Sequence, residues 1–165
     1  MELLLHSLIK EIAAKMPELS LIDKDYGQLE NIDEDNKDMY PITFPCVLLD
    51  APSVDWSYIQ GNSQKGEATI RVRLIIDCYD DTHFGSDTTH KIIERHEMVK
   101  QLHEIVQGFR SIDDGALMRK RSRFFTFNHG IKVYEAEYTC TVTDVIQTMT
   151  VNPSKVSFFL KTGSS

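Results

Sequence analysis

One stretch in the middle of the chain, GEATIRVRLIIDCYDD at residues 66–81, alternates apolar and polar side chains over an unusual length. Such alternation places successive side chains on opposite faces of a β-strand. Strands commonly contain ~5–6 residues, and this stretch approaches twice that length. It therefore predicts a long strand with an apolar face from Ala68 to Cys78 and a mixed face that carries Arg71 and Arg73.

A second long stretch, IKVYEAEYTCTVTDV at residues 131–145, shows the same division, and its inward set is Tyr134, Ala136, Tyr138, Cys140 and Val142. An antiparallel pairing of the two stretches would match their outward side chains, with Thr69 opposite Thr139, Arg71 opposite Glu137, Arg73 opposite Glu135 and Ile75 opposite Val133. Each cross-strand pair contributes only ~0.2–1 kcal/mol, so no single pair fixes the register and the prediction depends on all four matches. Because a slip of one residue would turn every side chain to the wrong face, they predict this register.

The outer face of the predicted strand pair combines charges with aliphatic side chains. It consists of Arg71, Arg73, Ile75, Val133, Glu135 and Glu137. Mixed surfaces of this kind are typical of protein–protein contacts, so these residues are the candidate subunit interface. The alternative is a plain solvent-facing side of the sheet that tolerates a few aliphatic residues.

Two segments have the period of an amphipathic helix. Residues 2–15 place Leu4, Leu5, Leu8, Ile9 and Ile12 on one side, and Pro17 ends the pattern. Residues 90–109 carry a stripe of Ile92, Val99, Leu102, Val106 and Phe109, with Ile93 and Ile105 beside it. Thr88 or Thr89 stands where a helix cap is expected.

The remaining apolar runs complete the expected fold. Shorter strands are expected at residues 42–50 and 53–61, and residues 122–145 suggest a hairpin that turns at Asn128–Gly130. The order of helices and strands predicts an α+β fold, in which a mainly antiparallel β-sheet with long strands packs against an N-terminal helix and one central helix.

The length of 165 residues favours a single α+β domain over residues 1–165. Within it, residues 20–41 are expected to form an acidic connector loop, since Asp23 to Asp38 holds seven carboxylates against two lysines. Residues 146–165 are expected to form an extended C-terminal segment.

The net charge of −7 argues against non-specific binding to nucleic acid or to anionic lipid. One basic patch, RKRSR from Arg119 to Arg123, is either a phosphate-backbone contact or a solvated loop or salt-bridged partner surface. Its shortness and its lack of an aromatic stacking platform favour the second interpretation, and no specific nucleic-acid binding is expected. No segment approaches the ~20 apolar residues of a membrane span, the N-terminus lacks the features of a signal peptide, and no membrane partner is expected.

Candidate chemical sites are few. The cysteines Cys46, Cys78 and Cys140 are widely spaced in strand-like contexts, which is typical of reduced core thiols in a cytosolic protein. The predicted central helix contains the possible metal ligands His90, Glu94, His96, Glu97 and His103. This set lacks the H-E-x-x-H spacing and a second ligand pair, so ordinary helix histidines are expected.

The acidic run NIDEDNKD, residues 31–38, departs from a calcium-binding loop at Lys37 and Asp38. The chain also lacks the sequence motifs of a nucleophile elbow, a phosphate-binding loop and a dinucleotide-binding turn. The sequence therefore predicts that the protein is not an enzyme, with no catalytic, cofactor-binding or metal residues. An enzymatic site assembled in space from scattered Ser, His and Asp residues is the alternative.

The layout of the whole chain supplies a further hypothesis. In order, it contains an N-terminal helix, the strand FPCVLLDAP, Trp56, the long strand of residues 66–81, a helix ending HEIVQGF and the strand IKVYEAEYTCTVTD. Over residues 2–145 this layout resembles the tail terminator or tail-completion proteins of long-tailed bacteriophages and prophages, within the head–tail joining group. The resemblance concerns the order of elements and carries no signature residues.

The resemblance implies a non-enzymatic structural protein that acts by homo-oligomeric ring assembly at the tail end or head–tail junction. Its partners would be further copies of itself together with tail-tube and head-connector proteins. It would reside in the host cytoplasm during assembly and then in the tail or neck of the virion. A different class of function, a small adaptor that binds another protein through an open sheet edge, is the second hypothesis.

Overall fold

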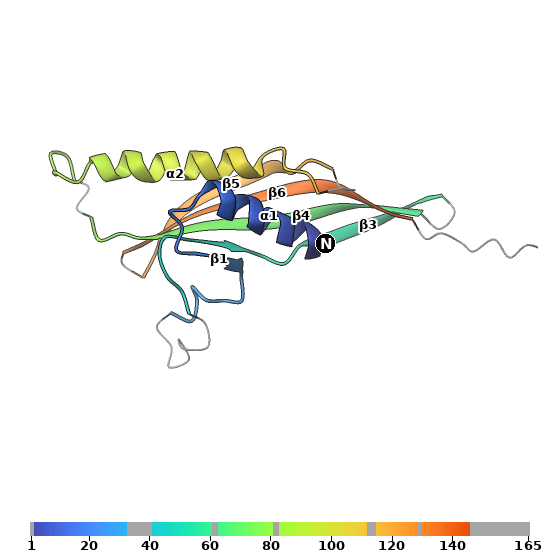
Figure 1. Cartoon of the computed structure of the whole chain (residues 1–165), viewed down its shortest axis with the longest axis horizontal. Helices are drawn as coiled ribbons and strands as arrows, with labels where there is room; N and C mark the ends of the chain where they lie inside the picture. Colours follow the sequence, from blue (N-terminus) through green and yellow to red (C-terminus); the bar gives the residue numbers. More distant parts are fainter. Residues whose placement is uncertain are drawn as a thin grey trace, which may run out of the picture.

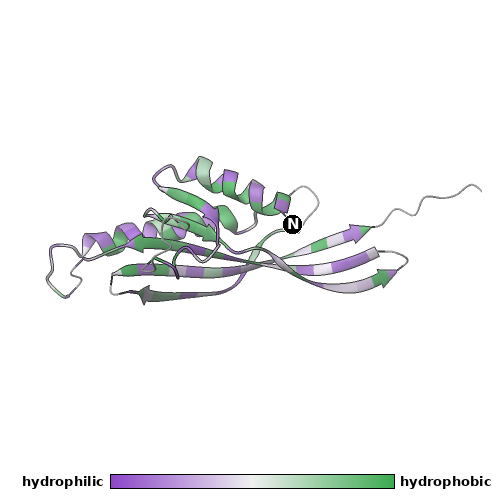
Figure 2. Cartoon of the chain, turned by 90° about the horizontal axis from the view of Figure 1, so that it is seen from below, coloured by the Kyte–Doolittle hydropathy of each residue, from purple (hydrophilic) through white to green (hydrophobic). Residues whose placement is uncertain are grey.

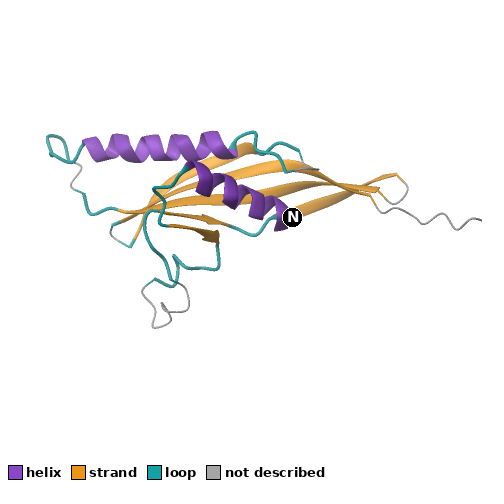
Figure 3. Ribbon diagram, viewed as in Figure 1, coloured by secondary structure: helices purple, strands orange, loops and turns teal. Residues whose placement is uncertain are grey.

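The computed structural model describes residues 2–32, 41–60, 63–80, 83–111, 115–128 and 130–145. Its elements are α1 (Glu2–Lys15), β1 (Leu21–Lys24), β2 (Cys46–Leu49), β3 (Ser53–Gln60), β4 (Ser63–Asp77), α2 (His90–Val106), β5 (Met118–Phe127) and β6 (Ile131–Val145). In the described part of the chain, two helices lie on an open, mostly antiparallel sheet of six strands (Figures 1 and 3). The fold is therefore α+β, as the sequence predicts.

The strand order across the sheet is β1-β2-β4-β6-β5. Strand β4 pairs with β2 over residues 72–75 and with β3 over residues 63–69, so β2 and β3 follow one another along the same side of β4. Only β1 and β2 run parallel among the described pairs. The predicted register of β4 and β6 is confirmed, because Arg71 lies opposite Glu137 and Ile75 opposite Val133.

The main hydrophobic core lies between the two helices and one face of the sheet. The α1 residues Leu4, Leu5, Leu8 and Ile12 and the α2 residues Leu102, Ile105 and Val106 contact the sheet residues Val47, Leu49, Ala68, Ile70, Val72, Leu74, Tyr138, Cys140 and Val142. Full burial of such aliphatic side chains contributes about 1.5–3 kcal/mol each. Figure 2 shows the helices on one side of the sheet, with apolar residues gathered where they meet it.

A second, smaller core lies on the opposite face of the sheet. Its buried members are Leu29, Cys46, Leu48, Ile75, Ile131 and Val133, and the aromatic side chains of Phe44, Phe125 and Phe127 pack around them. Leu29 belongs to the segment that follows β1, so part of the predicted connector folds over this face. Both faces of the sheet are therefore covered near its middle.

The strands extend well past the helices. With 15 residues each, β4 and β6 are ~50 Å long at the rise of a strand. Helix α2, with 17 residues, is only ~25 Å long. The β3–β4 hairpin and the end of β6 consequently project beyond the helices at one end of the molecule (Figure 1).

Three local predictions are corrected. Residues 21–24 of the expected connector loop form β1, because its backbone pairs with β2. The basic patch from Arg119 to Arg123 lies in β5, a strand that begins at Met118 rather than at residue 122. At the start of α2, Ile92 and Ile93 are exposed, because Arg95 instead faces the sheet and forms an ion pair with Asp80.

Other predictions fall partly or wholly outside the described residues. The most acidic part of the connector, residues 33–40, and the whole C-terminal segment, residues 146–165, are not among them. Thr89 stands at the start of α2, but its side chain makes no capping hydrogen bond. At the expected turn, Asn128 adopts a positive φ of 38° and its carbonyl accepts a hydrogen bond from the N–H of Gly130 at 2.7 Å, while residue 129 lies outside the described residues.

Candidate functional site

The candidate interface residues belong to two rows of alternating charge that cross the sheet. In the first row, Arg121 of β5 makes two hydrogen bonds to Glu137 of β6, at 2.8 and 2.6 Å. Arg71 of β4 follows, with its Nε 3.9 Å from Glu137 and its Nη1 3.0 Å from Asp50. The row therefore reads positive, negative, positive, negative from the β5 edge inward.

The second row repeats this order two residues along the strands. Arg123 makes two hydrogen bonds to Glu135, at 2.7 and 3.1 Å, and Glu135 lies 3.3 Å from Nε of Arg73. The Nη1 atom of Arg73 then contacts Asp25 at 3.1 Å and Glu30 at 2.6 Å. The acidic connector thus supplies the last charges of this row, which gives its described part a structural role.

The rows shift the pKa of the groups within them. Burial would raise the pKa of Glu135, but the hydrogen bond from Arg123 and the charges of Arg71 and Arg73 outweigh it and hold that pKa below its usual value. The pKa of Glu137 is lowered chiefly by its hydrogen bond from Arg121. For Asp50, burial prevails and raises the pKa despite Arg71. The two glutamates are therefore held ionised by the fold.

The aliphatic half of the candidate interface is not available to a neighbour. Ile75 and Val133 are completely buried, and Glu135 is 4% exposed. These three residues lie on the predicted outer face of the strand pair, opposite the helices, but the structure shows them buried there and not exposed. The physical reason is the second core, because Leu29 and the phenylalanines of β5 cover the face that the strand pattern marks as outward.

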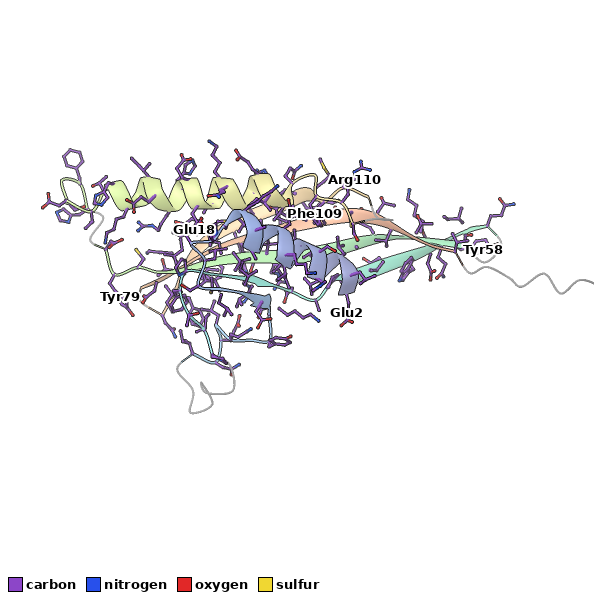
Figure 4. The ribbon with its side chains drawn as sticks, viewed as in Figure 1. Glu2, Glu18, Tyr58, Tyr79, Phe109 and Arg110 are labelled. Atoms are coloured by element: carbon purple, nitrogen blue, oxygen red, sulfur yellow. The ribbon has the colours of Figure 1, made fainter. Side chains whose placement is uncertain are left out.

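Exposed apolar side chains instead gather at the projecting end of the sheet. Trp56, Tyr58 and Ile59 of β3 and Val145 of β6 are all exposed large hydrophobic residues, and Tyr58 is 72% exposed. We call these four residues the tip surface. Tyr58 lies near the far end of the projecting strands, whereas Tyr79 lies at the opposite end of the molecule (Figure 4).

Gly66 helps to shape this end. No Cβ atom would fit there between Val54, Trp56 and Val142, so only a glycine lets these side chains close over the strand. Trp56 is thereby held against β4 with 45% of its surface exposed. The structure therefore shows Trp56 half packed and half presented to solvent.

A groove opens between α2 and strand β5 on the helix-covered face. Its volume is about 240 Å³, which is below the usual range of ligand pockets, and its lining includes Val99, Leu102, Phe124, Tyr134 and Ala136. Phe124 is exposed and stacks on Tyr134 with ring centroids 4.7 Å apart. At the floor, the hydroxyl of Tyr138 and Nδ1 of His103 lie 2.9 Å apart in a hydrogen bond.

The possible metal ligands of the central helix do not converge. His103 bonds to Tyr138, and His90 contacts the backbone oxygen of Asp87. Within the described ranges, no group of three or more His, Cys, Asp or Glu side chains is placed to hold a metal ion.

The three cysteines are all buried. Burial raises the pKa of the Cys46 thiol to about 12, so this thiol stays protonated at neutral pH. Cys78 lies between Arg95 and Asp80, with its Sγ 3.0 Å from Nη1 of Arg95. That cluster ties the end of β4 to α2, and we assign it no catalytic role.

The basic patch is largely engaged with the protein itself. Arg121 and Arg123 each bind a glutamate of β6, and Lys120 lies 3.5 Å from Glu67. Their side chains nevertheless remain more than half exposed. The patch thus forms ion pairs within the chain itself, and it displays its cations along the β5 edge.

Comparison of the chain with protein-family models finds no match, and no curated protein matches it significantly. None of the helices in the described part of the chain is long and apolar enough to span a membrane.

Proposed function

We propose that the protein is a non-enzymatic structural component that assembles with copies of itself into a ring, as at the tail end or head–tail junction of a bacteriophage or prophage. The observation that carries this proposal is the projecting end of the sheet. A strand pair ~50 Å long extends past helices half that length and ends in exposed aromatic and aliphatic side chains. A monomer gains little stability from such an extension.

The distribution of surface types supports assembly through unlike surfaces. The tip surface lies at one end of the molecule, while Tyr79 lies at the other end (Figure 4), the end at which α2 begins (Figure 1). Ile92 and Ile93 in the first turn of α2, and Phe84 shortly before it, are exposed as well. Contacts between two different surfaces of the same chain generate closed rings when the rotation closes. In a ring at the tail end, the partners would be tail-tube and head-connector proteins.

A second candidate function is a small adaptor that binds one other protein through an open sheet edge. The observation that favours it is strand β5, which pairs only with β6 among the described strands and keeps its other side open. An adaptor of this kind would be a stable monomer that captures an extended segment of its partner.

Native mass spectrometry over a concentration series, with negative-stain images of any large species, separates the two functions. We expect a closed ring with one copy number to appear as the concentration rises. A monomer at every concentration would contradict the ring and favour the adaptor.

A further inference from the structure

We propose that strand β3 of one copy pairs edge to edge with strand β5 of the next copy. This inference rests on the proposed function, because it names the contact through which copies of the chain would assemble. It is carried by three features of the two strands: their open edges, their opposite charges and the match of their faces.

Both strands have one open edge in the described part of the chain. Strand β3 pairs with β4 and strand β5 with β6, and neither has a second partner there. An open edge presents a row of backbone donors and acceptors that another strand can satisfy. With 8 and 10 residues, the two strands are long enough for a continuous ladder.

The charges of the two edges are opposite. On β5, the side chains of Lys120, Arg121 and Arg123 are 58%, 75% and 64% exposed. On β3, Asp55 lies directly opposite Glu67 of β4, and like charges in that position destabilise a sheet. Lys120 is near Glu67, but no cation of the described residues lies within ion-pair distance of Asp55. A cation from β5 of a neighbour would relieve this repulsion.

The two faces of the strands also match. Trp56 pairs with Gly66 and therefore lies on the helix-covered face, as Phe124 does through its pairing with Tyr134. Asp55 lies on the other face, as Arg121 does. Side chains alternate between the two faces of a strand. A single pairing of β3 with β5 therefore brings the aromatic residues of β3 beside the apolar groove and, on the other face, brings Asp55 beside the arginines of β5.

Pairing of like edges is disfavoured by the same charges. Two β5 strands would place cations against cations, and two β3 strands would bring their Asp55 side chains together. The favoured contact is therefore between unlike edges, which leaves each copy with one further edge to extend the assembly.

Cross-linking of mixed variants tests the pairing. One full-length chain carries Ser57→Cys in β3, and a second, isotope-labelled chain carries Lys120→Cys in β5; both positions are exposed and lie on the face of the sheet that carries Asp55 and Glu67. The two are mixed under assembly conditions and treated with a short bismaleimide, and the products are weighed. The native cysteines are at most 6% exposed, and untreated wild-type protein measures their background. A mixture of Ser57→Cys with Thr89→Cys, at the start of α2, controls for random collision.

We expect mixed-mass dimers of the Ser57→Cys and Lys120→Cys chains to exceed severalfold those of either variant alone and of the control mixture. If wild-type protein forms rings but these dimers stay at the control level, the β3–β5 pairing is wrong while the proposed function stands. Dimers within one variant alone would show pairing of like edges, which also overturns the inference. If neither rings nor cross-links form, both proposals fail.

Discussion

Strands β4 and β6 run together along the whole molecule, yet the two halves of this strand pair differ in what surrounds them. From Ala68 to Ile75 every second residue of β4 is buried against the helices, and Arg71 and Arg73 are held in charge rows on the opposite face. From Ser63 to Glu67, only Gly66 is buried. The backbone pairing is the same in both halves.

Within this strand pair, one half stabilises the fold and the other half is available for assembly. The covered half gains the burial of aliphatic side chains, which is the large stabilising contribution in this chain, and it holds buried ion pairs that are costly to break on one side. The projecting half gains the backbone ladder and little else, since its side chains face solvent. We therefore expect substitutions in the covered half to destabilise the fold and substitutions in the projecting half to leave the fold intact.

The largest difference should appear between two residues of the same strand. Ile70→Ala removes a completely buried side chain from the main core and should lower the free energy of unfolding by about 2–5 kcal/mol. Gln64→Ala, at an exposed position six residues earlier, should change it by less than about 0.5 kcal/mol. Urea unfolding of both variants measures the contrast. Equal losses would show that the two halves do not differ in stability.

A somewhat smaller effect is expected from the charge rows. Glu135→Gln leaves the shape nearly unchanged but removes the buried charge that contacts Arg123, Arg71 and Arg73. Breaking a buried ion pair should cost about 3 kcal/mol, the lower end of its usual range, because Arg73 keeps Asp25 and Glu30. Urea unfolding at neutral pH measures this loss. A variant as stable as the wild type would show that the rows do not stabilise the covered half.

Acidification should weaken the covered half through the same glutamates. The folded-state pKa values of Glu135 and Glu137 lie below the ordinary value of 4.5, so their contribution is fully present above that pH. It is lost as the pH falls from 4.5 through the folded-state values. Asp50, whose pKa is raised, has the opposite sign and offsets part of the loss.

Urea midpoints measured across this pH window should therefore fall on acidification, and Glu135→Gln should flatten the dependence. A wild-type midpoint that stays constant or rises as the pH decreases would contradict the role of these glutamates. A Glu135→Gln variant whose urea midpoint depended on pH as strongly as that of the wild type would contradict it as well.

The smallest effect on stability should come from the tip surface. The double variant Tyr58→Ser and Ile59→Ser replaces two side chains that are more than half exposed, so each change should alter the free energy of unfolding by no more than about 0.5 kcal/mol. Thermal unfolding monitored by circular dichroism checks this at a concentration where the wild type is monomeric. A loss as large as that of Ile70→Ala would mean that the tip stabilises the monomer.

The sequence predicted those parts of the fold in which the pattern of apolar and polar residues agrees with the pairs that the strands form. The register of β4 and β6 was predictable because a charge, an aliphatic and a hydroxyl pair all match in one alignment and in no shifted one. The helices were predictable from their apolar spacing. The face of α2 that packs on the sheet was predicted wrongly at the start of the helix. An apolar stripe includes Ile92 and excludes Arg95, but Arg95 faces the sheet because it forms an ion pair with Asp80.

The covered outer face was not predictable from the strands alone. Residues 25–32 have the composition of a solvated acidic loop, and only Leu29 and Ile32 hint that they pack on the sheet. Likewise, the run from Met118 to Arg123 lacks alternation of apolar residues, and β5 forms there because its arginines meet Glu135 and Glu137 across the ladder. In both places, long-range contacts decide what the local pattern leaves open.

The most direct test of the central claim is native mass spectrometry of the wild type beside the Tyr58→Ser, Ile59→Ser variant over one concentration series. The account predicts that the wild type forms a ring with a single copy number and that the variant stays monomeric with an unchanged melting temperature. A wild type that remains monomeric at all concentrations, or a variant that assembles as the wild type does, would contradict it.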